Sequence, residues 1–584
     1  MANFYKDNDD IQFLFHHLDM ARTAEIMEKG FQFSDEYDYA PDDLEDALDN
    51  YERILDSMGE ICGDHIAPTA EETDTTGNLL HEDGTVTRAP GIAKAIEMLS
   101  KADLMGFTLP YRFGGINCPQ CLFTMTNDIV SRADASLMNI YGLQGNADTL
   151  NAFASEEIKQ EYLPRMASGE WTGAMVLTEP DAGSDLQAVK TRAYQDEDGN
   201  WFIHGVKRFI TNGCGEVLLV LARTEPEISD GRGLSLLVCR NDETVKIRRL
   251  ENKLGIHGSP TCEIFFNNTP AKLVGERQRG LITYVMSLMN GARVGIAAQS
   301  LGIGEAAYRV ARDYAHSRKQ FDTAIENFPA IREVLCKAHV DLQAARAITY
   351  YGAWCVDIEH GALMRLETED LEKDEKTALR KQARSVGRWN KVLTPISKYY
   401  ASEMSMRVSN DAIAVLGGSG YMKDYPVERH LRDSRITTIY EGTSQLQVVA
   451  AIAGVTSGTA KSVIEHLIEK PSRVDEWTEE VAPLIEKIKS GLEDLDETVA
   501  FVKSQGNSYR DLVARKLVDM ATFLLAGALF CDHATVSDKK LAVAKYWLTW
   551  RMPELRMFKE QVLSGDTDPV DEFETIAGPV PVLE

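Results

Sequence analysis

The spacing of hydrophobic and polar residues divides the chain into four blocks. Apolar residues recur every three or four positions across residues 1–172, with acidic residues on the opposite face, which predicts helices. Short alternating or β-branched runs separated by glycine-rich turns predict strands in residues 173–279. Helical spacing returns over residues 280–455, and again over residues 456–584 after a joint of small and hydroxyl residues. We therefore expect an α+β protein, mostly α, with four domains at these boundaries.

The last block contains one clear amphipathic helix. Its polar face is dominated by Glu and Asp, which anionic lipid would repel, so the pattern favours a packed helix of a bundle over a helix on a membrane surface. The apolar positions that form its single stripe are Val481, Leu484, Ile485, Ile488, Leu492, Leu495, Val499 and Val502.

Composition narrows the classes of function. The 584 residues include 62 basic and 90 acidic side chains, a net charge of −28, which argues against nucleic acid as the main partner because phosphate binding needs clustered Lys and Arg. The N-terminal segment lacks the pattern of a signal peptide. The longest apolar run, residues 521–530, has about half of the ~20 residues that a membrane span requires. We expect a cytoplasmic protein with no membrane span.

Two short motifs are weak. Cys118 and Cys121 have the spacing of a zinc or redox pair, but no second pair or histidine cluster accompanies them, which favours a structural pair of reduced thiols. Residues 302–307 match G-x-G-x-x-A, but the segment before them reads as a helix, whereas a dinucleotide site of this type follows a strand. We expect no metal site.

Two segments carry groups suited to a flat polar cofactor. Thr178–Asp185 is a loop of small residues whose hydroxyls and backbone N–H groups suit a polar ring edge or a phosphate. Lys207–Gly213 places Phe209 and Thr211 two residues apart, on one face of the predicted strand, where a flat ring can stack and be hydrogen-bonded. Each segment alone is also compatible with an ordinary turn or strand.

A third segment offers a candidate base. Glu441 precedes a glycine that permits a close backbone approach, and the bulky neighbours Ile439 and Tyr440 would desolvate its carboxylate and make it a stronger base. A lone Glu before Gly is otherwise most often a solvated turn residue.

In this order and spacing, the three segments resemble the acyl-CoA dehydrogenase family. Two further motifs strengthen the resemblance, R-K-Q-F at 318–321 and G-G-x-G-Y-x-x-x-Y-P-V-E-R at 417–429, and the similarity covers about residues 60–455. It implies an N-terminal α-domain, a middle β-domain and a C-terminal four-helix α-domain, here with an extra C-terminal helical domain. The two ends resemble the long bacterial members, a subgroup that includes 3-(methylthio)propanoyl-CoA dehydrogenase.

The resemblance implies FAD as the cofactor, held partly by a neighbouring subunit, and therefore an oligomer. Shorter relatives pair dimers into tetramers through a surface that the C-terminal bundle from about residue 456 would cover here, so we expect a homodimer, with a tetramer as the alternative. A glutamine usual in the family before the Gly-Gly pair is replaced by Ala414, so some contacts to the adenosine half must differ. Positions matching the flavin-edge contacts are Met175, Leu177, Thr178, Ser184, Phe209 and Thr211; those matching the diphosphate and adenine contacts are Arg318, Phe321 and Gly418; Thr443 and Gln445 match further dinucleotide contacts.

For the substrate, Asn290 and Arg293 match positions that contact CoA, and Ser184 faces the thioester. Glu441 matches the catalytic base; some relatives carry the base at a position where this chain has Ala292. The implied reaction is α,β-dehydrogenation of an acyl-CoA to the trans-2-enoyl-CoA, with electrons passed to an electron-transfer flavoprotein. An acyl-CoA oxidase, a flavin monooxygenase and a non-catalytic interaction subunit remain alternatives, and the acyl group is open.

Overall fold

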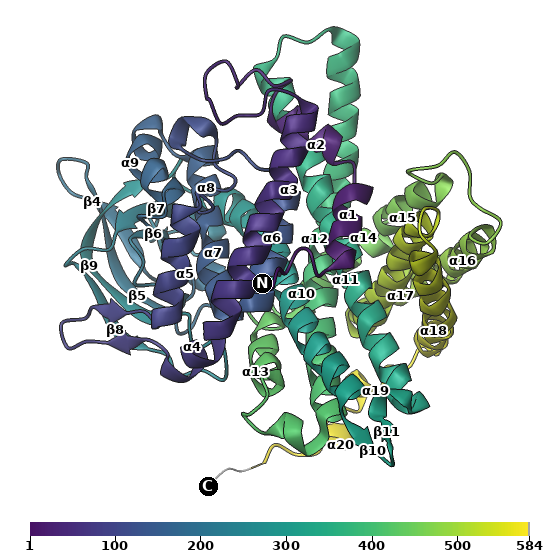
Figure 1. Cartoon of the computed structure of the whole chain (residues 1–584). Coiled ribbons are helices and arrows are strands. Elements are labelled where there is room, and N and C mark those ends of the chain that lie inside the picture. Colours follow the sequence, from purple (N-terminus) through teal and green to yellow (C-terminus); the bar gives the residue numbers. More distant parts are fainter. Residues whose placement is uncertain (582–584) are drawn as a thin grey trace. The chain divides into compact units, whose positions relative to one another are not determined.

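The computed structural model describes residues 1–581, which form two compact units (Figure 1). The first unit comprises residues 1–386 and 400–443, and the second comprises residues 387–399 and the described part of 444–584. Helix α12 (Lys373–Leu416) contributes to both. The predicted succession of helices, strands and helices is confirmed.

The first unit begins with helices whose starts are capped by side chains. Asn8, Asp43 and Ser155 accept backbone N–H groups at the starts of α1, α3 and α9, the arrangement typical of an N-cap. Cys118 and Cys121 are both buried at the start of α6. These helices are α1 (Asp9–His17), α2 (Met20–Met27), α3 (Leu44–Glu60), α4 (Ala70–Thr76), α5 (Pro90–Lys101), α6 (Gln120–Ala133), α7 (Ala135–Gly142), α8 (Asn146–Phe153) and α9 (Glu156–Ala167), with a short hairpin of β1 (Leu79–Leu80) and β2 (Val86–Thr87).

A seven-stranded sheet follows, in the order β3-β6-β4-β5-β9-β7, with β8 paired to β9 and β6 also paired to β7. Its strands are β3 (Gly173–Val176), β4 (Arg192–Gln195), β5 (Trp201–Thr211), β6 (Val217–Arg223), β7 (Leu234–Arg240), β8 (Val245–Leu250) and β9 (Thr261–Leu273). Strand β6 is buried on both sides: Val217, Leu219 and Leu221 pack with α8 and α9, whereas Leu218, Val220 and Ala222 pack with β5 and β9.

Long helices complete the first unit. α10 (Met286–Ser317) packs against α6, α11 (Pro329–Thr368) and α13 (Val427–Thr437), and the hairpin β10–β11 (Lys319–Gln320, Thr323–Ala324) follows it. By length and composition alone, Gly280–Ser317 could cross a membrane, as could α14 and α15 of the second unit if that bent pair formed one span. In this structure, α10 is a packed helix of a bundle.

The second unit is helical. The predicted apolar stripe lies on α16 and is buried throughout, as expected for a helix packed in a bundle. The Trp547 indole N–H donates to the carbonyl of Phe523 at 2.9 Å and so joins α17 to α18. The helices are α14 (Ser444–Thr456), α15 (Thr459–Glu469), α16 (Ala482–Gln505), α17 (Asn507–Ala534), α18 (Asp538–Leu563), α19 (Asp568–Asp571) and α20 (Phe573–Ala577).

Candidate active site

The two segments predicted to hold a flavin edge are hydrogen-bonded to each other. The backbone N–H of Arg208 donates to the carbonyl of Thr178 at 2.9 Å, which ties the end of β5 to the loop after β3. Thr178 and Thr211 are half-buried, and Ser184 is exposed further along the loop. The structure therefore joins two segments that the sequence placed in separate motifs.

A buried ion pair holds this loop in shape. The Lys207 ammonium is fully buried and donates to the carbonyl of Leu177 at 2.7 Å, and it lies 3.0 Å from the carboxylate of Glu179. The same carboxylate accepts the backbone N–H groups of Lys190 and Thr191 at 2.7 and 2.8 Å. Burial lowers the pKa of Lys207 to about 8, and the Glu179 charge opposes that shift. Lys207 is the first residue of the predicted Lys207–Gly213 segment, but the sequence pattern assigns its side chain no role.

Replacing Lys207 by methionine should reduce FAD retention, because it removes the donor to Leu177 and leaves the buried Glu179 carboxylate without its cation. The ratio of flavin to protein after gel filtration measures this effect. Lys190→Met is the matched control, since the Lys190 side chain on the same loop is 77% exposed. Equal flavin content in the two variants would contradict a supporting role for Lys207.

One detail of the predicted strand is different. The sequence reasoning assumed an uninterrupted strand that puts Phe209 and Thr211 on one face, but the register of β5 against β9 shifts between Lys207 and Ile210. Phe209 has a φ of 62°, and the residue is 52% exposed. An irregularity of this kind redirects a side chain out of the regular alternation. The exposed ring therefore comes from the bulge and not from strand periodicity.

The predicted substrate-binding and base residues also lie together. On α10 the Arg293 guanidinium donates to the side-chain carbonyl of Asn290 at 3.1 Å. Burial lowers the pKa of Arg293, and the nearby negative charge of Glu441 opposes this shift, which places the two charges close to each other. Within residues 1–581, the buried Nε of Arg293 has no hydrogen-bond partner, so it can donate to a ligand. Ala292 lies beside Arg293 on the same helix turn.

The backbone at Glu441 is unusual. Its φ is 52°, in the left-handed region that residues other than glycine rarely adopt, and Gly442 follows with a φ of 89°. Of its two bulky neighbours, Ile439 is 44% exposed. The Tyr440 hydroxyl is bonded to buried amide side chains of α7 and α10.

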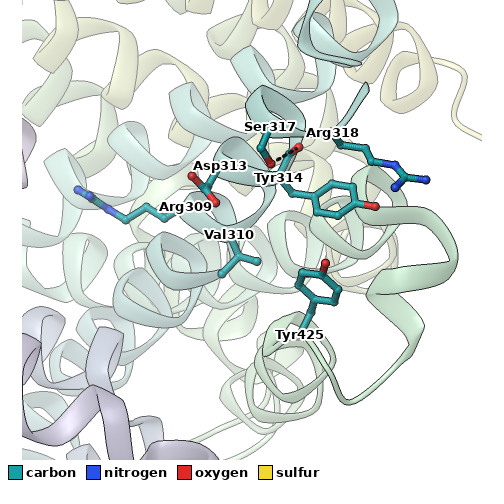
Figure 2. Close-up of a pocket in the computed structure, with 7 residues that line it drawn as sticks. All are labelled: Arg309, Val310, Asp313, Tyr314, Ser317, Arg318 and Tyr425. Atoms are coloured by element: carbon teal, nitrogen blue, oxygen red, sulfur yellow. Dashed lines mark hydrogen bonds between the residues drawn. The ribbon is translucent and has the colours of Figure 1, made fainter. Parts of the chain in front are cut away.

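A third group of predicted residues lies at the other end of α10, where a cavity of about 590 Å³ opens (Figure 2). Arg318 lines this cavity with Tyr314 and Tyr425 and makes no ion pair with any residue in the described part of the chain. Phe321, on the adjoining hairpin, is 90% exposed. The Tyr314 hydroxyl donates to Ser419, the residue after Gly418, at 3.4 Å.

These two ends are far apart. Arg293 lies on α10 and Arg318 directly follows its last residue, so the 25 positions between them span about 37 Å at 1.5 Å per residue. Thr443 directly follows the Glu441 turn, and Gln445 is exposed in the first turn of α14, in the second unit. Arg318 and Phe321 are therefore remote from the base of their own chain.

Three parts of the chain match models of known protein domains. Models of the acyl-CoA dehydrogenase N-terminal, middle and C-terminal domains match residues 49–170, 174–269 and 279–455. An acyl-CoA dehydrogenase of Bacillus subtilis (strain 168) is 34% identical over 372 residues, 62% of this chain and 90% of that protein. A 3-methylmercaptopropionyl-CoA dehydrogenase of Ruegeria pomeroyi is 31% identical over 470 residues, 75% of this chain and 74% of that protein.

The similarity of the fold to a solved structure extends beyond the three matched domains. The structure of an acyl-CoA dehydrogenase complexed with FAD from Bacillus anthracis is 20% identical, with a TM-score of 0.73, and the similarity covers 92% of each chain. Such coverage includes helices beyond the three matched domains. The three domain matches and the similarity to the Bacillus subtilis and Ruegeria pomeroyi proteins show that the chain belongs to the acyl-CoA dehydrogenase family.

Proposed function

We propose that the protein is an FAD-dependent acyl-CoA dehydrogenase that uses Glu441 to remove the α-proton of an acyl-CoA thioester. The observation that carries this proposal is the grouping of the Glu441 carboxylate with Arg293 and Asn290 on α10. A thioester bound there by its CoA portion would present its α-carbon near the Glu441 carboxylate.

The chain's own groups fit FAD. Thr178 and Thr211 offer hydroxyls beside the backbone of the joined loop and strand, and the bulge presents the exposed ring of Phe209 for stacking. Arg318 forms no ion pair within residues 1–581, and its guanidinium suits a diphosphate, because charge-assisted hydrogen bonds to phosphate oxygens are among the strongest that proteins make. When bound, FAD supplies the acceptor for the two electrons and the β-hydrogen of the substrate.

The protein's part in the chemistry is positioning and proton transfer. An α-proton of a thioester is weakly acidic, so its removal requires both a base and donors to the carbonyl oxygen, where negative charge develops. We assign the base to the Glu441 carboxylate and one donor to its backbone N–H. Ala292 has no group that accepts a proton, so Glu441 acts without a second base on α10.

We also propose that electrons pass to an electron-transfer flavoprotein and that the substrate has a short or thioether-containing acyl chain. The similarity to the Ruegeria pomeroyi enzyme over three quarters of the chain supports the second part. The test is anaerobic titration of the purified protein with short, branched, aromatic and thioether acyl-CoAs while flavin absorbance is followed. Bleaching by the short or thioether acyl-CoA, together with formation of a 2-enoyl-CoA, supports the proposal. Bleaching only by the branched or aromatic compounds would contradict the proposed acyl chain, bleaching by none would contradict the proposed activity, and rapid reoxidation in air would favour an oxidase.

The separation of Arg318 from Arg293 supports a shared site in a homodimer, in which Arg318 and Phe321 reach the FAD of the neighbouring chain. Arg318→Ala should then weaken FAD binding roughly ten- to hundredfold, because it removes a hydrogen bond to a charged group. Arg312→Ala is the control, since Arg312 is paired with Glu326. Flavin fluorescence during dilution measures FAD release. An active monomer in light scattering would contradict the shared site.

A further inference from the structure

The turn that carries Glu441 adopts a conformation that surrounding contacts must enforce. α13 ends before it, with the backbone N–H of Tyr440 donating to the carbonyl of Ile436 at 3.1 Å. The chain then takes a φ of 52° at Glu441, and non-glycine residues keep such values only where neighbouring structure determines them. The direction of the carboxylate therefore depends on what holds the residues beside it.

The Tyr440 side chain reaches a buried network of hydrogen-bonded side chains. Its hydroxyl donates to the side-chain carbonyl of Gln299 and lies 3.1 Å from that of Asn139. The Gln299 amide group donates to the carbonyl of Ala135 at 2.8 Å and to Asn139 at 2.9 Å, and Gln299 is fully buried. Asn139 in turn donates to the Ser259 hydroxyl at 3.2 Å. Because both donors of Gln299 are used, its carbonyl is left to face Tyr440.

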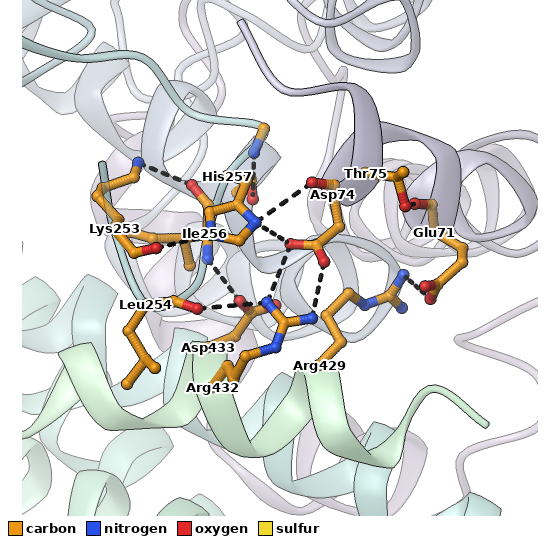
Figure 3. A network of polar contacts seen from close by, with 12 residues as sticks. Glu71, Asp74, Thr75, Lys253, Leu254, Ile256, His257, Arg429, Arg432 and Asp433 are labelled. Atoms are coloured by element: carbon orange, nitrogen blue, oxygen red, sulfur yellow. Dashed lines mark hydrogen bonds and ion pairs between the residues drawn. The ribbon is translucent and has the colours of Figure 1, made fainter. Parts of the chain in front are cut away.

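The far end of this network is fixed by the loop between β8 and β9 (Figure 3). The Lys253 ammonium donates to the carbonyls of Ile256 and Ser259 at 2.8 and 2.6 Å. The Asp433 carboxylate on α13 accepts the backbone N–H of Ile256 at 2.5 Å. The loop is thus bonded both to the helix that precedes Glu441 and to the hydrogen-bond network that reaches Tyr440.

We propose that Tyr440 is a positioning residue for the α-proton abstraction: its hydroxyl, held by Gln299 and Asn139, fixes the turn so that the Glu441 carboxylate faces the α-carbon. This inference rests on the proposed function, in which Glu441 is the base. Tyr440 does not transfer the proton. Its contribution is the orientation of the neighbouring residue, and small displacements of a reacting group are costly because the reaction needs close alignment.

Tyr440→Phe removes only the hydroxyl. We expect the limiting rate of anaerobic flavin reduction to fall roughly 10- to 100-fold, while the acyl-CoA concentration for half-saturation changes less than twofold and FAD content is unchanged. Tyr350→Phe is the matched control, because the Tyr350 hydroxyl is also buried and donates to Asp128 at 2.9 Å, away from the turn. Its limiting rate should equal that of the wild type. A wild-type limiting rate in Tyr440→Phe would overturn the inference.

A second variant guards against a loss of folding. Gln299→Met removes the acceptor from the other side of the same contact and should lower the limiting rate in the same way. In the double variant the two effects on the limiting rate should not multiply, because each substitution removes the same hydrogen bond between Tyr440 and Gln299. Multiplying effects, or equal slowing by Tyr350→Phe, would show general disturbance and refute the positioning role. Glu441→Gln separates the two hypotheses: if it reduces flavin at the wild-type rate, the proposed function fails, whatever Tyr440→Phe does.

Discussion

Glu441→Gln is expected to slow flavin reduction by acyl-CoA about 10²- to 10⁴-fold, the range that a positioned general base contributes. Glutamine keeps the shape of the side chain and the backbone N–H at this position but accepts no proton from carbon. Acyl-CoA should therefore still bind and perturb the flavin spectrum. Anaerobic stopped-flow spectroscopy, with an acyl-CoA found active in the titration, measures both binding and reduction.

A relocated base tests the same geometry. Ala292 is next to Arg293 on α10, and the charge of Glu441 acts on the Arg293 guanidinium. A carboxylate at position 292 would therefore lie near the substrate α-carbon that Glu441 faces. Ala292→Glu in the Glu441→Gln background should restore part of the lost rate. Ala292→Gln in that background is the control, because it adds the same volume without a base. A Glu441→Gln variant that reduces flavin as fast as the wild type would remove Glu441 from the mechanism.

Arg346→Met is expected to destabilise the first unit by about 3–5 kcal/mol, the typical cost of removing one partner from a buried ionic cluster. Arg346 is fully buried and donates to Asp128 at 2.9 Å, Asp10 at 2.8 Å and Glu305 at 2.9 Å. Without the guanidinium, these carboxylates remain buried with less compensating charge. Methionine fills a similar volume, so the measured loss reports charge more than packing.

The pH dependence gives this prediction a second readout. Burial alone would raise the pKa of Glu305, but Arg346, Arg309 and Arg132 more than offset it and hold the pKa at about 2. In the wild type this carboxylate contributes stability above its ordinary pKa of 4.5, and that contribution is lost as pH falls toward 2. In Arg346→Met the carboxyl pKa values rise, so protonation relieves the buried charge. The loss of stability should therefore be smaller at pH 5 than at pH 8.

Urea denaturation monitored by circular dichroism at both pH values measures this difference. Arg309→Met is the matched control: Arg309 also pairs with Glu305, at 2.6 Å, but its side chain is 33% exposed, so its loss should cost about 1 kcal/mol or less. Equal destabilisation by the two variants would contradict the importance of burial at Arg346.

The periodicity of apolar residues was enough to predict the fold class. The stripe from Val481 to Val502 and the strand pattern of β6 follow from burial of one face or both faces of regular elements, which is a local property of the sequence. The candidate site was predicted by motif order: Thr178, Arg293 and Glu441 were each named, but their proximity was implied only by resemblance to a family.

The sequence by itself therefore determined the elements, the residue types available for catalysis and the family. The tertiary structure alone decided which side chains support them. The Lys207–Glu179 pair joins β5 to the loop after β3, and the Tyr440 contact joins positions 141 residues apart. The bulge at Phe209 and the left-handed turn at Glu441 depend on such contacts too. Periodicity reports whether a position is buried, but the partner of a buried polar group depends on how distant segments pack, and no local pattern encodes that choice.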